Sequence, residues 1–211
     1  MIHELRTYTL WPGKVPAFLK LAEEKARPIR GNDYGTMEGY WFTEIGALNQ
    51  VVHLWSYDDL NARQDARDRL AQNKAWREEY TSQVFPLIQK QEIRLLHPRM
   101  PLKPPANQGN IYEYRYYRTA TGKAGEFIAG MVEAMPARER YSQNVCLWQS
   151  EAAQPNEVSH LWAYESFEAR MAARGESVKD DEWRAFLAKA GTLLEEMHSL
   201  LLIPAPFSPL G

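Results

Sequence analysis

One nine-residue stretch of this sequence occurs twice. Residues 49–57 read NQVVHLWSY and residues 156–164 read NEVSHLWAY, so six of nine positions are identical at a separation of 107 residues. A match this dense in a chain of 211 residues is hard to obtain by chance. The chain is therefore predicted to be two copies of one structural unit of about 100 residues each, a usual domain size. Any function has to be sought in what the copies share.

The first copy, residues 1–98, has the order strand, helix, strand, strand, helix, strand. Alternating apolar and β-branched residues predict strands over residues 2–10, 37–44, 50–57 and 93–97. Helical spacing predicts a helix over residues 15–26 that Pro28 ends, and two more that Asp59 and Asn73 cap, the last one kinked by Pro86. This order is that of a ferredoxin-like βαββαβ unit, with the helices on one face of an antiparallel sheet.

The second copy, residues 111–211, follows a linker at residues 99–110. The stretch from His97 to Pro105 has four prolines in nine residues, which predicts a stiff, extended connection. Pro136 is predicted to end the first helix of the second copy, as Pro28 does in the first. The chain ends in a further proline-rich segment from Pro204, which is predicted to lie along the surface.

Shared residues alternate along the first strand of each copy. Four residues two positions apart return 109 residues later: Ile2, Glu4, Arg6 and Tyr8 as Ile111, Glu113, Arg115 and Tyr117. The intervening positions differ between the copies. Because successive side chains point to opposite faces of a strand, one face of each sheet is common to the copies and the other has diverged. We call the common face the kept face; on residues 50–57 it also carries His53 and Trp55.

The kept face mixes charged and apolar groups. Glu4 and Arg6 stand two apart on one side of a strand, as do Glu113 and Arg115. An unpaired buried charge is costly, so one interpretation is a buried ion pair that fixes the strand register. The other is a polar rim on an apolar pocket.

His53 and His160 allow two interpretations as well. One histidine per copy is too few for a protein-built metal site, which takes three or four ligands. Each is either a neutral, hydrogen-bonded core histidine or a residue that contacts a ligand or moves a proton, work that a pKa near 6.5 suits.

Other repeated residues lie on the predicted helices. Arg63 and Arg67 are four apart, as are Arg170 and Arg174, which predicts a solvated, locally paired helix face or, alternatively, an anion site. Trp76 stands three residues after the cap Asn73, and Trp183 is its counterpart in the second copy. Both are predicted to pack a helix against the sheet rather than to contact a ligand.

Composition excludes several classes of function. The net charge of −2 gives no basic surface for nucleic acid. No apolar run reaches the ~18–20 residues that span a bilayer, and the N-terminus lacks a signal-peptide core. The single cysteine, Cys146, permits no intrachain disulfide, in keeping with a cytoplasmic protein. The motifs of nucleotide-binding loops, serine hydrolases and zinc proteases are absent from the sequence, and neither a metal nor another cofactor is expected.

Three stretches together resemble a known family. They are ELRTY at residues 4–8 with PGK at 12–14, GYWFTEIG at 39–46 and LNQVVHLW at 48–55. They resemble the NIPSNAP domain, of the dimeric α/β-barrel superfamily. The second copy departs from the pattern, with Tyr114 at the leucine position, Cys146 in place of Gly39 and no counterpart of Gly46.

The resemblance implies an α+β fold in which two ferredoxin-like repeats pair their antiparallel sheets into an intrachain pseudo-dimeric α/β barrel. It implies no accepted reaction, since NIPSNAP-like proteins are linked to vesicular transport and mitochondrial signalling. Superfamily relatives include cofactor-free monooxygenases, lactone isomerases and haem enzymes. Their pockets lie between sheet and helices and are lined by His, Asn, Trp, Tyr and Arg.

Two main hypotheses follow for the function. The first is a small apolar or aromatic molecule bound in a pocket of each repeat, with a weak cofactor-independent activity, monooxygenase- or isomerase-like by analogy, left open and its catalytic residues unassigned. The candidate ligand-binding residues are His53, His160, Asn49, Asn156, Trp55, Trp162, Glu4, Arg6, Tyr8, Glu113, Arg115 and Tyr117. The second is a non-catalytic interaction scaffold whose kept face is fully packed. Haem binding is a remote third, and the sequence is compatible with further homo-oligomers of pseudo-dimeric chains.

Overall fold

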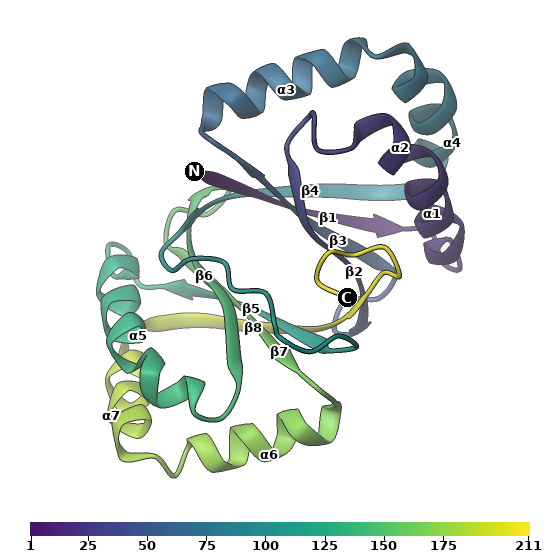
Figure 1. Ribbon diagram of the computed structural model, residues 1–211. Coiled ribbons are helices and arrows are strands. Elements are labelled where there is room, and N and C mark those ends of the chain that lie inside the picture. The colour runs from purple at the N-terminus through teal and green to yellow at the C-terminus, as the bar shows by residue number, and fades with distance from the viewer. The chain divides into compact units, whose positions relative to one another are not determined.

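The computed structural model describes all 211 residues, which form two compact units. Unit one comprises Met1–Leu95 together with Pro204–Gly211, and unit two comprises Leu96–Ile203. Each unit contains one copy of the repeat, so the copies found in the sequence are structural copies. Figure 1 shows the strands and helices of both units.

Unit one has the predicted ferredoxin-like order. Its strands are β1 (Ile2–Leu10), β2 (Thr36–Ile45), β3 (Gln50–Tyr57) and β4 (Ile88–Pro98). Its helices are α1 (Val15–Leu21), α2 (Arg27–Arg30), α3 (Leu60–Gln72) and α4 (Ser82–Val84), with π-helical segments at Ala22–Ala26 and Trp76–Thr81. The helices lie on one face of the sheet, with α1 and α4 side by side (Figure 1).

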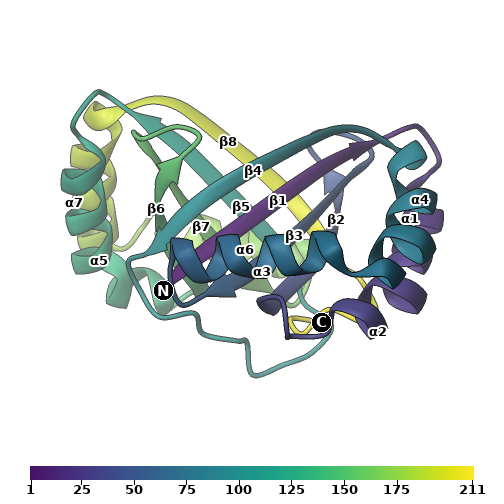
Figure 2. The ribbon, with the colours of Figure 1, turned by 90° about the horizontal axis from the view of Figure 1, so that it is seen from above.

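Unit two repeats this arrangement. Its elements are β5 (Ile111–Thr119), α5 (Ala124–Glu139), β6 (Gln143–Ala152), β7 (Glu157–Tyr164), α6 (Phe167–Ser177), α7 (Asp181–Ala190) and β8 (Leu194–Pro204). Helices α5 and α7 lie side by side in both ribbon views (Figure 2). The sheet of unit one contains the order β1-β3-β2 and that of unit two the order β8-β5-β7-β6, with antiparallel pairing in both, which confirms the predicted α+β fold of two ferredoxin-like repeats.

Strand register is the same in the two units. Arg6 of β1 lies directly opposite His53 of β3, and Arg115 of β5 lies directly opposite His160 of β7. Because opposite residues of an antiparallel pair share a face, the repeated register places an arginine and a histidine together on each kept face.

The two predicted helix caps are confirmed, and the second copy has an equivalent cap at Asp180. Asp59 accepts the backbone N–H of Ala62 at 2.8 Å, and Asn73 accepts that of Trp76 at 3.1 Å. Asp180 accepts that of Trp183 at 3.1 Å. Each side chain satisfies one of the donors that a helix start leaves without a partner, so local chemistry sets these helix starts.

Pro28 and Pro136 do not end their helices as predicted. Pro28 lies in the first turn of α2, where its missing N–H costs little, directly after the π-helical segment Ala22–Ala26. The helix continues to Arg30 and ends at Gly31, whose φ of 50° lies in the region that glycine adopts without steric cost. Pro136 lies inside α5, and its neighbours are buried, so tertiary packing holds that helix past the missing hydrogen bond.

The prediction for Pro86 was also wrong, in the other direction: Pro86 lies at the end of its helix and does not kink it. It lies in a final 3-10 turn, Phe85–Leu87, and β4 begins at the next residue, Ile88. The predicted strand began at residue 93, so it was five residues too short at this end. The residues that follow Ile88 in β4 are polar and exposed, so this part of the strand lacks the alternation of apolar residues from which a strand is predicted.

The C-terminal segment is packed into unit one, which contradicts the prediction that it lies along the surface. Ala205 donates its N–H to the carbonyl of Tyr40 at 2.9 Å, and Ser208 Oγ accepts the N–H of Tyr40 at 3.0 Å. The Phe207 ring lies 4.9 Å from that of Tyr40 and is buried, as is Leu210. These apolar residues anchor a segment whose prolines suggested exposure.

The residues between the repeats run along β6 in unit two. Arg99 donates its N–H to the carbonyl of Leu147 at 2.7 Å, and Lys103 donates to that of Val145 at 2.8 Å. The segment is therefore extended and held by backbone hydrogen bonds over its first half. No helix of the structure has the length and apolar character needed to cross a bilayer.

Candidate functional site

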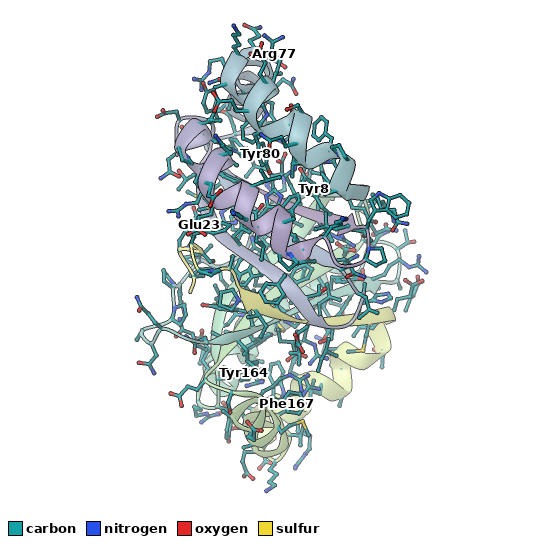
Figure 3. The ribbon with its side chains drawn as sticks, turned by 90° about the vertical axis from the view of Figure 1, so that its right-hand side faces the viewer. Tyr8, Glu23, Arg77, Tyr80, Tyr164 and Phe167 are labelled. Atoms are coloured by element: carbon teal, nitrogen blue, oxygen red, sulfur yellow. The ribbon has the colours of Figure 1, made fainter.

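A cavity of about 650 Å³ lies against the kept face of unit one. The sheet contributes Arg6, Tyr8, His53 and Trp55, and the helical side contributes residues of α2, α3, α4 and the two π-helical segments. Tyr8 of β1 and Tyr80 of the π-helical segment Trp76–Thr81, both labelled in Figure 3, line the cavity from the sheet and from the helices. The kept face is therefore not filled by the helices that cover it.

Unit two holds a second cavity in the same place. It has a volume of about 340 Å³ and lies between β5, β7 and the helices α5 to α7. Met131 lines this cavity at the position that Ala22 occupies in unit one, so its longer side chain accounts for part of the smaller volume.

At seven equivalent lining positions the two cavities carry the same residue. In unit one they are Arg6, Tyr8, Arg30, His53, Trp55, Arg67 and Trp76. In unit two they are Arg115, Tyr117, Arg138, His160, Trp162, Arg174 and Trp183. Each set combines three guanidinium groups, one imidazole and three large aromatic rings. The shared set is the candidate site of each repeat.

The histidine of each site is oriented by the tryptophan two residues later. Trp55 donates its indole N–H to Nδ1 of His53 at 2.6 Å, and Trp162 donates to Nδ1 of His160 at 2.5 Å. A neutral imidazole that accepts at Nδ1 carries its proton on Nε2. Both Nε2 atoms are buried and have no hydrogen-bond partner, so each histidine presents a free N–H donor.

Both histidines are neutral over a wide pH range. Burial lowers the pKa of His53 well below 6.5, and the nearby charges of Arg6, Arg30 and Arg67 lower it further. Burial also lowers the pKa of His160 well below 6.5, with Arg115 acting in the same direction. The structure therefore supports the first interpretation, a neutral, hydrogen-bonded core histidine, and each ring also lines a cavity. Contact with a ligand stays a prediction.

The predicted ion pairs on the kept face are present. Arg6 Nη1 lies 2.8 Å from Glu4 Oε1, and Arg115 lies 3.6 Å from Glu113. Burial favours the neutral carboxyl of Glu4, but the surrounding guanidinium groups hold its pKa below the ordinary value. Neither glutamate lines a cavity; each lies behind its arginine and supports it.

The arginine pairs on α3 and α6 do not form the solvated, locally paired face that was predicted. Arg63 binds the second carboxylate oxygen of Glu4, and Arg170 binds Glu113 through both oxygens, at 2.7 and 3.1 Å. One turn on, Arg67 and Arg174 are half-buried and line the cavities. The helices therefore turn these arginines toward the sheet, because its buried carboxylates need cationic partners.

Arg30 and Arg138 belong to the sites and were not predicted. Arg30 Nη2 donates to the Tyr57 hydroxyl at 2.9 Å, and its guanidinium lies 3.2 Å from the centroid of the Trp55 ring. Arg138 is placed in the same way over Trp162, at 4.6 Å. A signal exists in the sequence, since the pattern Pro-x-Arg occurs at residues 28–30 and again at residues 136–138.

Other predictions about site residues need correction. Trp76 and Trp183 belong to the apolar clusters of their units, as predicted, and they also line the cavities, which the prediction did not include. Asn49 and Asn156 do not line either cavity. Asn49 has a φ of 56° in the turn before β3, and the amide oxygen of Asn156 accepts the N–H of Gly122 at 3.2 Å. The shared asparagines are therefore turn residues, a role to which asparagine is well suited.

The chemistry available at each site is that of hydrogen-bond donation beside aromatic surfaces. His53 Nε2 and Arg30 Nε are buried at the first cavity without a partner, as are His160 Nε2 and Arg115 Nε at the second. A general base is harder to find, since Nδ1 of each histidine already accepts a hydrogen bond and Nε2 already bears a proton.

Comparison with known proteins identifies the family. The sequence model described as NIPSNAP matches residues 3–101 and again residues 112–209. The NipSnap homolog of Dictyostelium discoideum is 30% identical over 209 residues, covering 96% of this chain and 87% of that protein. Human NipSnap homolog 3A is 32% identical over 215 residues, covering 100% and 86%.

Solved structures share the fold over nearly the whole chain. A provisionally assigned monooxygenase from Lactobacillus acidophilus has a TM-score of 0.71 at 13% identity, covering 100% of this chain and 96% of its own. Another from Fusobacterium nucleatum has a TM-score of 0.73 at 9% identity, covering 97% and 92%. At these identities the likeness concerns the fold alone.

Proposed function

This chain belongs to the NIPSNAP family, and we propose that it binds a small apolar or aromatic molecule in each of its two repeats. The single observation that carries the proposal is the pair of cavities lined by seven equivalent residues. Protein interiors are packed nearly without voids, so a purely structural face would be filled. Both volumes, about 650 and 340 Å³, lie in the range of about 300–1,000 Å³ usual for ligand pockets.

The lining favours flat, apolar molecules. Trp55 and Trp76 with Tyr8 give the first cavity three aromatic walls, and Trp162, Trp183 and Tyr117 give them to the second. Aromatic rings contribute large apolar contact areas and stack well on planar groups. The few polar atoms that face the ligand would then fix its orientation.

A non-catalytic scaffold is the alternative, and it predicts a kept face that is fully packed between sheet and helices. The cavities in both repeats weigh against that alternative. The buried histidine and arginine N–H groups weigh against it too, because an unsatisfied buried donor costs about 1–3 kcal/mol and is retained where it serves a ligand.

A weak reaction on the bound molecule remains within the proposal. The geometry supports His53 and His160 as hydrogen-bond donors to a ligand oxygen, such as a carbonyl whose charge grows during proton removal. It supports neither as the base that removes the proton. A cofactor-independent isomerase- or monooxygenase-like reaction would need the base from the substrate itself or from another residue.

Binding is tested by calorimetric titration of the full chain with 2-naphthalenemethanol, an uncharged aromatic probe, with tryptophan fluorescence read in parallel. The expected result is two binding events of unequal affinity and quenching of the buried tryptophans. The Trp11→Phe variant removes an exposed tryptophan from the background signal. Absence of any heat or fluorescence response, for this probe and for a small set of aromatic analogues, contradicts the proposal.

His53→Ala and His160→Ala assign each event to a repeat. Each substitution is expected to weaken one event and leave the other unchanged, because the two sites are lined by different residues. Loss of both events in either single variant would point to unfolding or to a shared site, and circular dichroism separates these outcomes.

A further inference from the structure

We infer that the ligand of each site is an organic anion: an apolar or aromatic body that ends in an oxyanion, of which a carboxylate is the simplest. This inference rests on the proposed function and adds the chemical class of the ligand. The head group would lie on Arg30 and Arg67 beside His53 in repeat one, and on Arg138 and Arg174 beside His160 in repeat two.

The buried charges around the first cavity include more guanidinium groups than carboxylates. The buried carboxylate of Glu4 is bound by Arg6 on one oxygen and by Arg63 on the other. Arg30 has only neutral partners, namely the Tyr57 hydroxyl at 2.9 Å, the Tyr34 carbonyl at 3.0 Å and the Trp55 ring. A buried cation without an anionic partner is expensive, so a ligand anion has a place to bind.

Arg67 adds a second such charge. It lines the cavity half-buried, and burial together with the charge of Arg6 lowers its pKa, as expected for neighbouring cations that are not fully balanced. The only carboxylate in the lining is Glu23, which is exposed on the helical rim (Figure 3). The inner wall of the cavity is therefore cationic.

The second cavity has the same imbalance without any acidic lining residue. Its charged lining consists of Arg115, Arg138 and Arg174. Glu113 lies behind the wall and is bound by Arg170 at 2.7 Å and by Ser199 at 2.6 Å, with Arg115 and Arg174 both farther away at 3.6 Å. Arg138 donates to the neutral hydroxyls of Ser142 and Tyr164, at 2.6 and 3.3 Å.

The unpartnered polar atoms point to the same ligand. At the first cavity they are Arg30 Nε and His53 Nε2, and at the second they are Arg115 Nε and His160 Nε2. All four are N–H donors, given the histidine tautomer fixed by the tryptophans. A ligand that satisfies them must offer acceptors, and an oxyanion offers several that guanidinium groups bind in a forked geometry.

A purely structural role for these arginines is the rival explanation. Stacking of Arg30 on Trp55, and of Arg138 on Trp162, stabilises the tryptophans whether or not a ligand binds. That role does not explain Arg67 and Arg174, which line the cavities from two other helices, α3 and α6. These two are therefore the residues to change.

The test compares three probes that share one aromatic body: 2-naphthoate, 2-naphthyl phosphate and the uncharged 2-naphthalenemethanol. Calorimetry on the full chain is expected to show that an anion binds at least about ten-fold more tightly than the alcohol, because a hydrogen bond to a charged group is the stronger kind. Preference between carboxylate and phosphate identifies the head group. A higher salt concentration should weaken the binding of the two anions and leave the binding of the alcohol nearly unchanged.

Arg67→Gln and Arg174→Gln are the test variants, each for its own repeat. Each is expected to lower affinity for the preferred anion about ten-fold at one site and to leave the alcohol unchanged, and Arg67→Lys should recover part of the loss. Arg77→Gln and Arg184→Gln are the matched controls, since both arginines are exposed and line neither cavity; Figure 3 shows Arg77 at the outer end of unit one.

The outcomes separate the inference from the function on which it rests. Equal binding of anions and alcohol, with no effect of Arg67→Gln or Arg174→Gln, overturns the anion inference and leaves the binding function standing. If none of the three probes binds to folded wild-type protein, both are overturned. Thermal melting of each variant shows whether it is folded, and Arg67→Lys serves if the glutamine variant is not.

Discussion

His53 accepts the indole N–H of Trp55 on its Nδ1 atom, across 2.6 Å, and so turns its Nε2–H toward the cavity of the first repeat. His160 and Trp162 repeat the contact at 2.5 Å. One hydrogen bond thus sets both the tautomer and the direction of the polar atom that a ligand would meet.

Trp55→Phe tests this contact. The substitution keeps an aromatic wall but leaves Nδ1 of a buried histidine without a donor, so the free energy of unfolding should fall by about 1–3 kcal/mol. Nitrogen NMR of the imidazole should show the Nε2–H tautomer in the wild type and a mixture in the variant. Trp11→Phe, at an exposed tryptophan, should change neither. An unchanged tautomer in Trp55→Phe would show that another group fixes the ring.

Stability should fall as the solution becomes acidic, starting near pH 6.5. Burial lowers the pKa of His53 and His160 well below 6.5, and burial with the N-terminal charge lowers that of His3 to about 4. Below about 6.5 the unfolded chain therefore binds more protons than the folded one, and each such histidine adds a slope of up to about 1.4 kcal/mol per pH unit. Above about pH 6.5 these histidines are neutral in both states, so they contribute no pH dependence to the free energy of unfolding.

Urea denaturation between pH 5 and 8 measures this dependence. The paired variant His53→Gln/His160→Gln should show a shallower fall below pH 6.5 than the wild type, whatever its absolute stability. A wild-type stability that is flat from pH 7.5 to 5.5 would contradict the assignment of these histidines as buried and neutral.

Glu4→Gln should be strongly destabilising. Glu4 is fully buried and binds both Arg6 and Arg63, so its neutralisation leaves two cations without their partner. Loss of one member of a buried ion pair costs about 3–5 kcal/mol. Glu24→Gln breaks an exposed pair with Lys20 at 3.9 Å and should cost less than about 1 kcal/mol. Chemical denaturation compares the two, and similar small losses would mean that Glu4 is better solvated than the structure implies.

The residue pair Ala22 and Met131 should control the size of ligand that each site accepts. Both are buried and line equivalent walls. Ala22→Met should weaken binding of the four-ring probe 1-pyrenemethanol to repeat one more than binding of 2-naphthalenemethanol, because the longer side chain fills part of the cavity.

Met131→Ala is the reciprocal change in repeat two. It should admit the larger probe to that site, at a cost of about 2–5 kcal/mol in the free energy of unfolding. Fluorescence titration with both probes checks the pair of variants. If selectivity for probe size stays the same in both, other residues set the cavity volumes.

The sequence by itself determined the repeat, the family and the order of the strands. It also gave the kept face, since identity at alternate positions of β1 and β3 needs only the period of a strand. Helix starts at Asp59, Asn73 and Asp180 followed from local capping chemistry. These features depend on residues that are near one another in the chain, which is why one sequence suffices for them.

Only the tertiary structure decided where helix residues point and whether the kept face encloses space. Arg67 lines a cavity and Arg63 binds Glu4 because α3 is rotated toward the sheet, an orientation that the strongly polar sequence of α3 does not reveal. Helix α5 runs through Pro136 because packing outweighs one lost hydrogen bond. Cavity volume is a small difference between large packed volumes, set by contacts between residues far apart in the chain, and no local pattern encodes it.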